Sequence, residues 1–224
     1  MVEREPGGAG AVTSGAGAAV RGIEAVLLDL GNVLVGWDPY RAFAGRMPLD
    51  AVEAFFAEVD FAHLNSRQDA GRPWAHARAE LEQSTPQHVP ALDLYVAHFD
   101  DALTGPVPGT AAIVEDLIAG GVRVLGLTNW SAQLYHHAVP AAAAIGLLED
   151  VLVSGDVGLV KPDPAIFRLA ARRFGLDPAR TLFVDDSAAN VAAAADEGFD
   201  AVLFTDADAL RTELVARGLV PSAG

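Results

Sequence analysis

The sequence contains no cysteine, a single lysine and few basic residues of any kind. Without cysteine, the 224-residue chain has no disulfide, no thiolate zinc site and no cysteine nucleophile. No apolar run reaches the roughly 18 residues that a membrane-spanning helix needs. The 15 Lys and Arg residues are outnumbered by 30 Asp and Glu residues, so the formal net charge is −15. This acidity disfavours nucleic acid and anionic membranes as partners, and we expect neither.

Apolar residues are abundant, at 51% of the chain, which is typical of a compact globular protein. The length allows one large domain or a domain that carries an insertion. Residues 1–21 are rich in Gly and Ala and lack the basic start and leucine-rich stretch of a secretory signal, so we predict a flexible tail there. The lack of cysteine fits a reducing compartment, and we expect a cytoplasmic protein.

Apolar, β-branched runs alternate with helical patterns along most of the chain. Strands are predicted at residues 23–30, 122–127, 151–154, 181–184 and 201–204, and helices at 110–119, 132–144, 164–174, 188–197 and 207–217. Strands that alternate with helices imply right-handed crossovers. The pattern therefore predicts an α/β fold, a Rossmann-like and mostly parallel sheet with helices on both faces.

The segment 39–103 breaks this alternation. It contains amphipathic helical patterns at residues 50–56, 73–82 and 91–103 and no strand pattern. We interpret it as a small helical cap inserted after the first strand. The predicted domains are a tail (1–21), a Rossmann-like core (22–38 and 104–224) and the cap (39–103).

Chemically active side chains follow the carboxyl ends of the predicted strands. Asp29 ends the first strand, Thr128 the second, and Asp185 and Asp186 the fourth, while Lys161 lies shortly after the third. In an open parallel sheet these ends border one crevice, where ligands bind. The only lysine among 14 arginines favours a site that needs a compact ammonium, although an arginine-rich composition could also leave one lysine by chance. Together these segments predict a phosphoryl-transfer centre.

Four of these segments also carry a family resemblance. The segment Asp29-Leu30-Gly31-Asn32-Val33-Leu34 resembles the first motif of the haloacid dehalogenase superfamily of aspartate-nucleophile hydrolases. Residues 124–129 are similar to its second motif, Lys161-Pro162 to its third and residues 183–187 to its fourth. Their order and spacing match over nearly the whole chain after the tail, including the helical insertion. Four motifs in order are far more specific than any one alone.

The resemblance implies a role for each residue type. Asp29 would attack phosphorus and form an aspartyl-phosphate, which splits one difficult displacement into two. Lys161 would bridge Asp29 and the phosphate and limit the repulsion between two anions. Thr128 and Asn129 would bind phosphate oxygens, and they could also cap the helix that follows.

A magnesium site is implied by the same resemblance. Mg²⁺ binds few carboxylates and keeps much of its water. Its ligands would be Asp29, the backbone carbonyl of Gly31 and Asp186. Asp185 stands at the position that is commonly glycine in the family, so we expect it to raise the negative potential or to bind the metal through water.

Gly31 departs from the pattern of most phosphatases in this family, which carry there an aspartate that protonates the leaving alcohol. Its absence could remove roughly 10²- to 10⁴-fold in rate. A subgroup with the same Asp-Leu-Gly-Asn-Val form includes sugar-phosphate phosphatases, among them a glucose-1-phosphate phosphatase. Asp38, just before Pro39, is a candidate replacement acid, although Asp-Pro is more typical of a plain turn.

Five cap residues are candidates to contact the leaving group, and their alternative roles are helix packing and simple exposure. They are His63, Asn65, Asp69, Arg72 and Trp74. Sequence alone does not show which of the five is nearest to Asp29, because that distance depends on how the cap folds.

We therefore expect a Mg²⁺-dependent phosphoric monoester hydrolase that acts on a small phosphorylated metabolite, with a sugar phosphate favoured, as a monomer or homodimer. One alternative is a metal-independent 2-haloacid dehalogenase, against which the paired acids Asp185 and Asp186 argue. Another is a weakly catalytic protein that binds a phosphometabolite, for which Gly31 is the best support.

Overall fold

A five-stranded parallel sheet forms the centre of the computed structural model, which describes residues 22–221. Its strand order is β5 (Val151–Val153), β4 (Arg123–Thr128), β1 (Ala25–Leu28), β6 (Thr181–Asp185) and β7 (Asp200–Leu203). All four neighbouring pairs are parallel. The predicted α/β class is confirmed, and the predicted tail lies outside the described residues.

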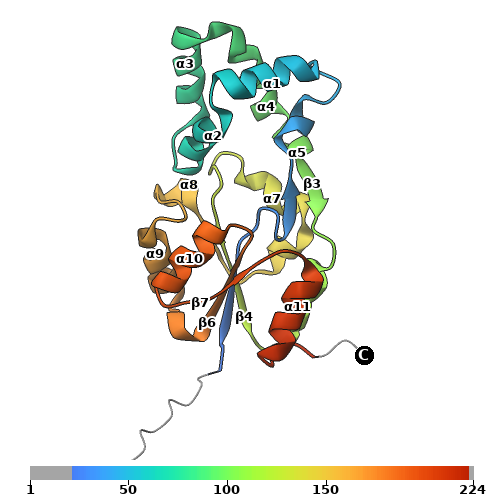
Figure 1. Ribbon diagram of the computed structural model, residues 1–224, viewed down its shortest axis with the longest axis vertical. Coiled ribbons are helices and arrows are strands. Elements are labelled where there is room, and N and C mark those ends of the chain that lie inside the picture. The colour runs from blue at the N-terminus through green and yellow to red at the C-terminus, as the bar shows by residue number, and fades with distance from the viewer. Residues whose placement is uncertain (1–21, 222–224) are drawn as a thin grey trace, which may run out of the picture.

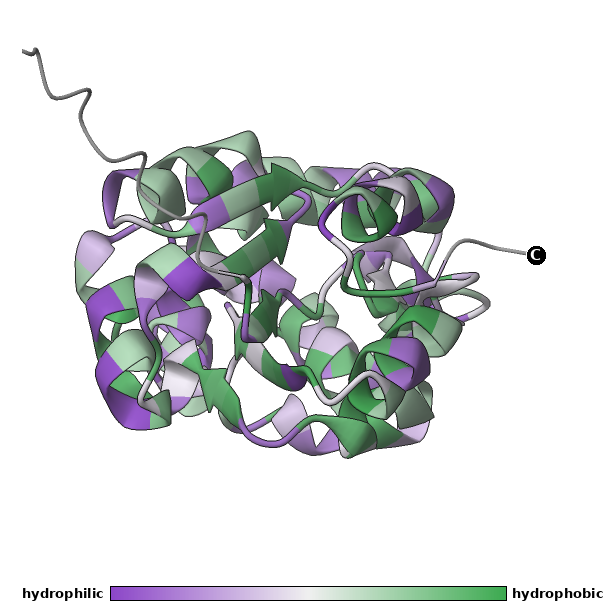
Figure 2. Ribbon diagram, turned by 90° about the horizontal axis from the view of Figure 1, so that it is seen from below, coloured by the Kyte–Doolittle hydropathy of each residue, from purple (hydrophilic) through white to green (hydrophobic). Residues whose placement is uncertain are grey.

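Both faces of this sheet are covered by helices, which explains why its strands read as continuous apolar runs. In β1, Val26 and Leu28 pack toward α6 (Thr110–Ala119) and α11 (Ala207–Ala216). Ala25 and Leu27 pack on the other side toward α9 (Pro164–Phe174) and α10 (Ala188–Asp196). Figure 1 shows α9 and α10 on one side of the sheet and α11 on the other. Seen from below, hydrophobic strands lie between the two groups of helices (Figure 2).

One predicted helix is wrong. Residues 132–144 do not form a single helix, because the chain there turns through η3 (Tyr135–His137), α7 (Ala138–Ala141) and η4 (Ala143–Leu147). Pro140 is tolerated only near the start of a helix, and Gly146 has a low helix propensity, so this stretch supports short turns. The remaining short elements are α8 (Ser154–Val157) and η5 (Pro178–Arg180). Within residues 22–221, none of the helices combines the length and the apolar character that crossing a membrane would require.

Residues 39–102, here called the cap segment, consist of helices and the turns that connect them. The helices are η1 (Pro39–Phe43), α1 (Leu49–Glu58), α2 (Phe61–Asp69), α3 (Trp74–Ser84), η2 (Pro86–His88), α4 (Val89–Ala97) and α5 (Phe99–Ala102). In Figure 1, α1 to α4 gather above the sheet. The division of the chain into a core domain and a cap domain stays a prediction.

An antiparallel pair of short strands, β2 (Val35–Trp37) and β3 (Leu103–Pro106), carries the chain into and out of the cap segment. The sequence did not predict this pair, because three- and four-residue strands that contain Gly36, Gly105 and Pro106 lack a readable alternation. Leu103, expected to end a helix, begins β3 instead. The cap segment is therefore joined to the rest of the chain through this pair.

Candidate active site

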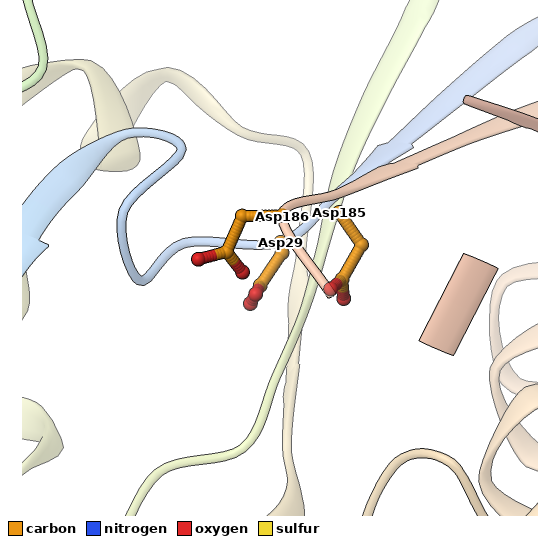
Figure 3. Close-up of side chains that lie close together, drawn as sticks. All are labelled: Asp29, Asp185 and Asp186. Atoms are coloured by element: carbon orange, nitrogen blue, oxygen red, sulfur yellow. The ribbon is translucent and has the colours of Figure 1, made fainter. Parts of the chain in front are cut away.

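The residues predicted from the sequence meet at the carboxyl ends of three neighbouring strands. Asp29 directly follows β1, Thr128 ends β4 and Asp185 ends β6, and Leu28 is in register with Gly126 and Val184. Figure 3 shows the carboxyl groups of Asp29, Asp185 and Asp186 gathered there, with Asp29 between the other two in this view. One oxygen from each of the three lies within 4.8 Å of the others.

Lys161 is buried at the centre of this group, with a side chain that is 1% exposed. Its Nζ lies 2.9 Å from Asp29 Oδ1 and 2.6 Å from Asp185 Oδ2, and it donates to the Leu127 carbonyl at 2.9 Å. An ammonium has three N–H donors, so these three oxygens match its full capacity. The structure therefore places Lys161 between Asp29 and Asp185. Its predicted bridge from Asp29 to phosphate stays a prediction.

Asp185 is fully buried and saturated with hydrogen bonds. Its Oδ1 accepts from the Ser187 backbone N–H at 2.8 Å and from Asn190 Nδ2 at 2.9 Å. Its Oδ2 accepts from Lys161 at 2.6 Å and from Asn190 at 3.1 Å. This geometry favours Asp185 as an anchor for Lys161 and disfavours it as a metal ligand.

Asp186 is exposed, and its Oδ2 accepts a hydrogen bond from Asn32 Nδ2 at 3.2 Å. Asn32 has a left-handed backbone, with φ of 55°, and its Oδ1 accepts from the Trp37 N–H at 3.2 Å. Asparagine tolerates this conformation better than most residues. The sequence analysis assigned no role to Asn32, although its place after Gly31 in the turn was a usable signal.

Burial dominates the electrostatics of the site. It raises the pKa of Asp29 to about 6, with a further increase from Asp185, and Lys161 only partly offsets these effects. For Lys161, burial acts to lower the pKa, but the attraction of Asp29 and Asp185 outweighs it, so the pKa lies above its ordinary value. The ammonium therefore stays charged, and further positive charge beside Asp29 would favour its carboxylate.

Asn129 joins the second and third predicted motifs. Its Nδ2 donates to the Lys161 carbonyl at 2.9 Å, and its Oδ1 accepts from the Lys161 backbone N–H at 2.8 Å. Both ends of the amide are thus engaged in holding the Lys161 loop. The sequence predicted a phosphate contact by the side-chain amide or the backbone N–H of Asn129, and with the amide engaged the backbone N–H is the donor that stays a prediction. Thr128, 1% exposed, lies directly before it.

A cavity that is partly open to solvent lies between this site and the cap segment. Its lining includes Gly31, Asn32 and Asn129 on the side of the sheet and is largely apolar elsewhere. Its aromatic residues are Trp37, Trp74, Tyr95, Phe99 and Trp130. None of the described residues that line it is Lys, Arg or His, and the single carboxylate among them is Asp69.

Three of the five cap candidates, Asn65, Asp69 and Trp74, line this cavity. Arg72 is not among the lining residues, and its guanidinium pairs with Glu80 at 2.5 Å. His63 is exposed and does not line the cavity either. Asp38 accepts from the Tyr40 N–H at 3.1 Å and caps η1, as the turn interpretation predicts, and it is not among the lining residues.

Residues 23–198 match the family model of the haloacid dehalogenase-like hydrolases. The chain belongs to this family. The hydrolase is 27% identical over 173 residues to a phosphoserine phosphatase of Thermus thermophilus, a match that covers 76% of this chain and 70% of that protein. It is 30% identical over 184 residues to a plasmid-borne phosphoglycolate phosphatase of Cupriavidus necator, covering 80% of this chain and 69% of the relative.

The hydrolase is also 27% identical over 195 residues to a drimenol cyclase of Aspergillus calidoustus, covering 86% of this chain. It spans only 36% of the length of that cyclase. These relatives differ in the activities that their names state, so the shared segment is compatible with different substrates.

Solved structures share the fold of the hydrolase. A haloacid dehalogenase family enzyme of Bacteroides thetaiotaomicron, in complex with magnesium and inorganic phosphate, has a TM-score of 0.65 at 21% identity, covering 83% of this chain and 96% of its own. The L-2-haloacid dehalogenase of Xanthobacter autotrophicus, with chloropropionic acid covalently bound, has a TM-score of 0.60 at 20% identity, covering 89% and 85%. At this identity the likeness concerns the fold.

Proposed function

We propose that this hydrolase is a Mg²⁺-dependent phosphatase that cleaves a small phosphorylated metabolite through an aspartyl-phosphate on Asp29. The observation that carries the proposal is the grouping of Asp29, Lys161 and Asp186 at one strand edge. Two relatives named as phosphatases, and a neighbour of the same fold that holds magnesium and phosphate, support it.

Asp29 is arranged for nucleophilic attack through one of its oxygens. Oδ1 accepts from the Leu30 N–H at 2.7 Å and pairs with Lys161, which fixes the orientation of the carboxylate. Oδ2 would then attack phosphorus, while the bond to the leaving oxygen breaks and its electron pair moves onto that oxygen. Thr128 and the Asn129 backbone N–H would hold the phosphoryl oxygens as charge redistributes over them.

The donor set around Asp29 fits Mg²⁺. Asp29 and Asp186 would hold the ion together with the carbonyl of Gly31, and water would complete the shell. Bound there, the ion would neutralise charge on the phosphoryl group. Asp185 would act through Lys161, since its four acceptor contacts are already made.

The lining of the cavity favours a substrate whose alcohol part is neutral. A carboxylate on the leaving group would meet no Lys, Arg or His among the described lining residues. A sugar phosphate fits this condition, because aromatic side chains can pack against the ring and Asn65 can bond a hydroxyl. Aryl and alkyl phosphates fit it as well. The same absence of a cation disfavours a 2-haloacid substrate, which carries a carboxylate.

Phosphate release from a panel of sugar, aryl and alkyl phosphates, with Mg²⁺ or with EDTA, tests the proposal. We expect turnover that needs Mg²⁺ and falls by at least roughly 10⁴-fold in Asp29→Asn, because the nucleophile is lost. Phosphate release by a contaminating phosphatase would be the same in the Asp29→Asn preparation. Halide release from 2-chloropropionate without phosphate release would instead establish the dehalogenase. Capture of BeF₃⁻ at Asp29 with no turnover on any ester would favour the binding protein.

A further inference from the structure

Asp69 is held by contacts between the cap segment and the residues that follow β4 and β5. It ends α2, and its backbone carbonyl accepts from the buried Ser154 hydroxyl at 2.6 Å. Its carboxyl group accepts from the Ser131 backbone N–H and, through Oδ2, from Asn65 Nδ2 at 2.9 Å. Ser131 is three positions after Thr128 in the chain. A cap carboxyl is thereby fixed beside the loop proposed to bind phosphate.

This carboxyl group has no cationic partner within residues 22–221, unlike Asp29 and Asp185, which both pair with Lys161. Burial raises its pKa to about 7, and the hydrogen bond from Ser131 only partly opposes that increase. A substantial fraction of Asp69 is therefore protonated at neutral pH, which is the condition a proton donor needs.

The position of Asp69 also matches the side on which a leaving group would lie. In an in-line displacement the nucleophile and the leaving oxygen are on opposite sides of phosphorus. Asp29 approaches from the sheet, so the leaving oxygen points into the cavity that Asp69 and Gly31 both line. Gly31 contributes no side chain there, and an added Cβ would meet no atom within 4 Å, so the space is open.

We propose that Asp69 donates the proton to the leaving oxygen and so performs from the cap segment the step for which Gly31 has no side chain. This inference rests on the proposed phosphatase function. As the bond from phosphorus to the leaving oxygen breaks, that oxygen takes the proton of the Asp69 carboxyl. The products are an aspartyl-phosphate on Asp29, a neutral alcohol and an Asp69 carboxylate. In the second step, water attacks phosphorus and gives a proton to the Asp69 carboxylate. The bond between phosphorus and Asp29 Oδ2 breaks at the same time and its electron pair returns to Asp29, so inorganic phosphate leaves and both aspartates return to their starting states.

Other groups near the cavity are less suited to this step. The Tyr95 hydroxyl lines it, but burial raises the pKa of this phenol well above its ordinary value, so it is a poor donor. Asp38, the replacement acid considered from the sequence, caps η1 outside the lining. Asp186 is exposed beside Asp29, where it is proposed to hold the metal ion.

Two substrates with different leaving groups test the inference on Asp69→Asn. Benzyl phosphate leaves as an alkoxide that needs a proton, whereas p-nitrophenyl phosphate leaves as a stable phenolate that needs little help. We expect kcat/KM for benzyl phosphate to fall by about 10²-fold or more and that for p-nitrophenyl phosphate to change by less than about threefold. Retained turnover of the second substrate also establishes that the variant is folded.

Two further variants sharpen the test. Asp38→Asn is a matched control and should leave both substrates unchanged. The double variant Gly31→Asp with Asp69→Asn should recover benzyl phosphate turnover, because it supplies a carboxyl from the open space at residue 31. An equal loss on both substrates, or no loss on either, would overturn the inference and leave the phosphatase proposal standing. If the wild-type protein turns over no ester of the panel in a way that Asp29→Asn abolishes, the proposed function fails and takes this inference with it.

Discussion

The two sides of the cavity differ in the partners of their carboxyl groups. On the sheet side, Asp29 and Asp185 lie within 3 Å of the Lys161 ammonium, and Asp185 is saturated with hydrogen bonds. On the cap side, Asp69 has aromatic neighbours and no cationic partner among the described residues. On the sheet side, an ammonium opposes the charge of the two buried carboxylates and fixes their positions. On the cap side, one buried acid with a pKa of about 7 can exchange a proton near neutral pH.

The comparison also separates two kinds of information. The family match spans both sides, since it covers residues 23–198, and the four motifs recognised in the sequence lie on the sheet side. Under the proposed function, the cap side would supply the side chains that contact the alcohol part of a substrate. Relatives at 27% to 30% identity have names that state different activities, which is the pattern expected when the two sides vary independently.

The largest effect should follow from removing the positive charge on the sheet side. In Lys161→Met, Asp29 and Asp185 face each other without a cation, and breaking a buried pair in this way costs about 3–5 kcal/mol in the free energy of unfolding. Phosphatase turnover should fall below detection. Chemical denaturation measures the loss of stability, and adding Asp185→Asn should recover part of it by removing one of the two charges. Unchanged stability in the single variant would contradict the paired arrangement.

A smaller effect should distinguish the two neighbouring aspartates. Asp186→Asn should raise the Mg²⁺ concentration for half-maximal activity by about 10- to 100-fold or more, because a proposed ligand is lost. Asp185→Asn should leave that concentration nearly unchanged and lower turnover instead, because it disturbs Lys161. Magnesium titrations of the two variants measure the difference. A large shift in Asp185→Asn alone would reverse the assignment.

The smallest effect concerns the pH dependence of stability, which arises from the cap side. The folded-state pKa of Asp69 is about 7 against an ordinary value of 3.8, so between these pH values the folded protein binds more protons than the unfolded chain. Stability should therefore fall as pH rises from about 4 to about 7 and then level off.

Asp69→Asn should flatten part of this fall. Asp29, with a pKa of about 6, acts in the same direction, but it is present in both proteins and cancels in their difference. Thermal unfolding in EDTA at a series of pH values measures that difference. Parallel curves for the two proteins would mean that Asp69 titrates near its ordinary value.

Much of the sheet could be predicted from the sequence, because buried parallel strands leave apolar runs that the polar residues at their ends interrupt. That pattern was enough to predict that one edge of the sheet holds Asp29, Thr128, Lys161 and Asp186. It could not show that Asp185 binds Lys161, since the direction of each carboxylate depends on the helix that supplies Asn190.

The cap side was less predictable for a related reason. Asp69 ends a helix in a segment whose orientation depends on β2 and β3, and those strands are too short to leave a pattern. Its contacts with Ser131 and Ser154 join residues more than 60 positions apart in the sequence. The sequence therefore predicted five cap residues that could contact the leaving group, but it could not rank them.

The buried Ser154 hydroxyl links the two sides through a single oxygen. It accepts from the Trp130 N–H at 2.9 Å and donates to the Asp69 carbonyl at 2.6 Å. Tilting α2 away from the sheet would break the second bond and carry the acid out of reach of a bound ester. Under the proposed mechanism, substrate would enter with α2 tilted away, and the leaving oxygen would receive its proton only after the Ser154 contact has re-formed.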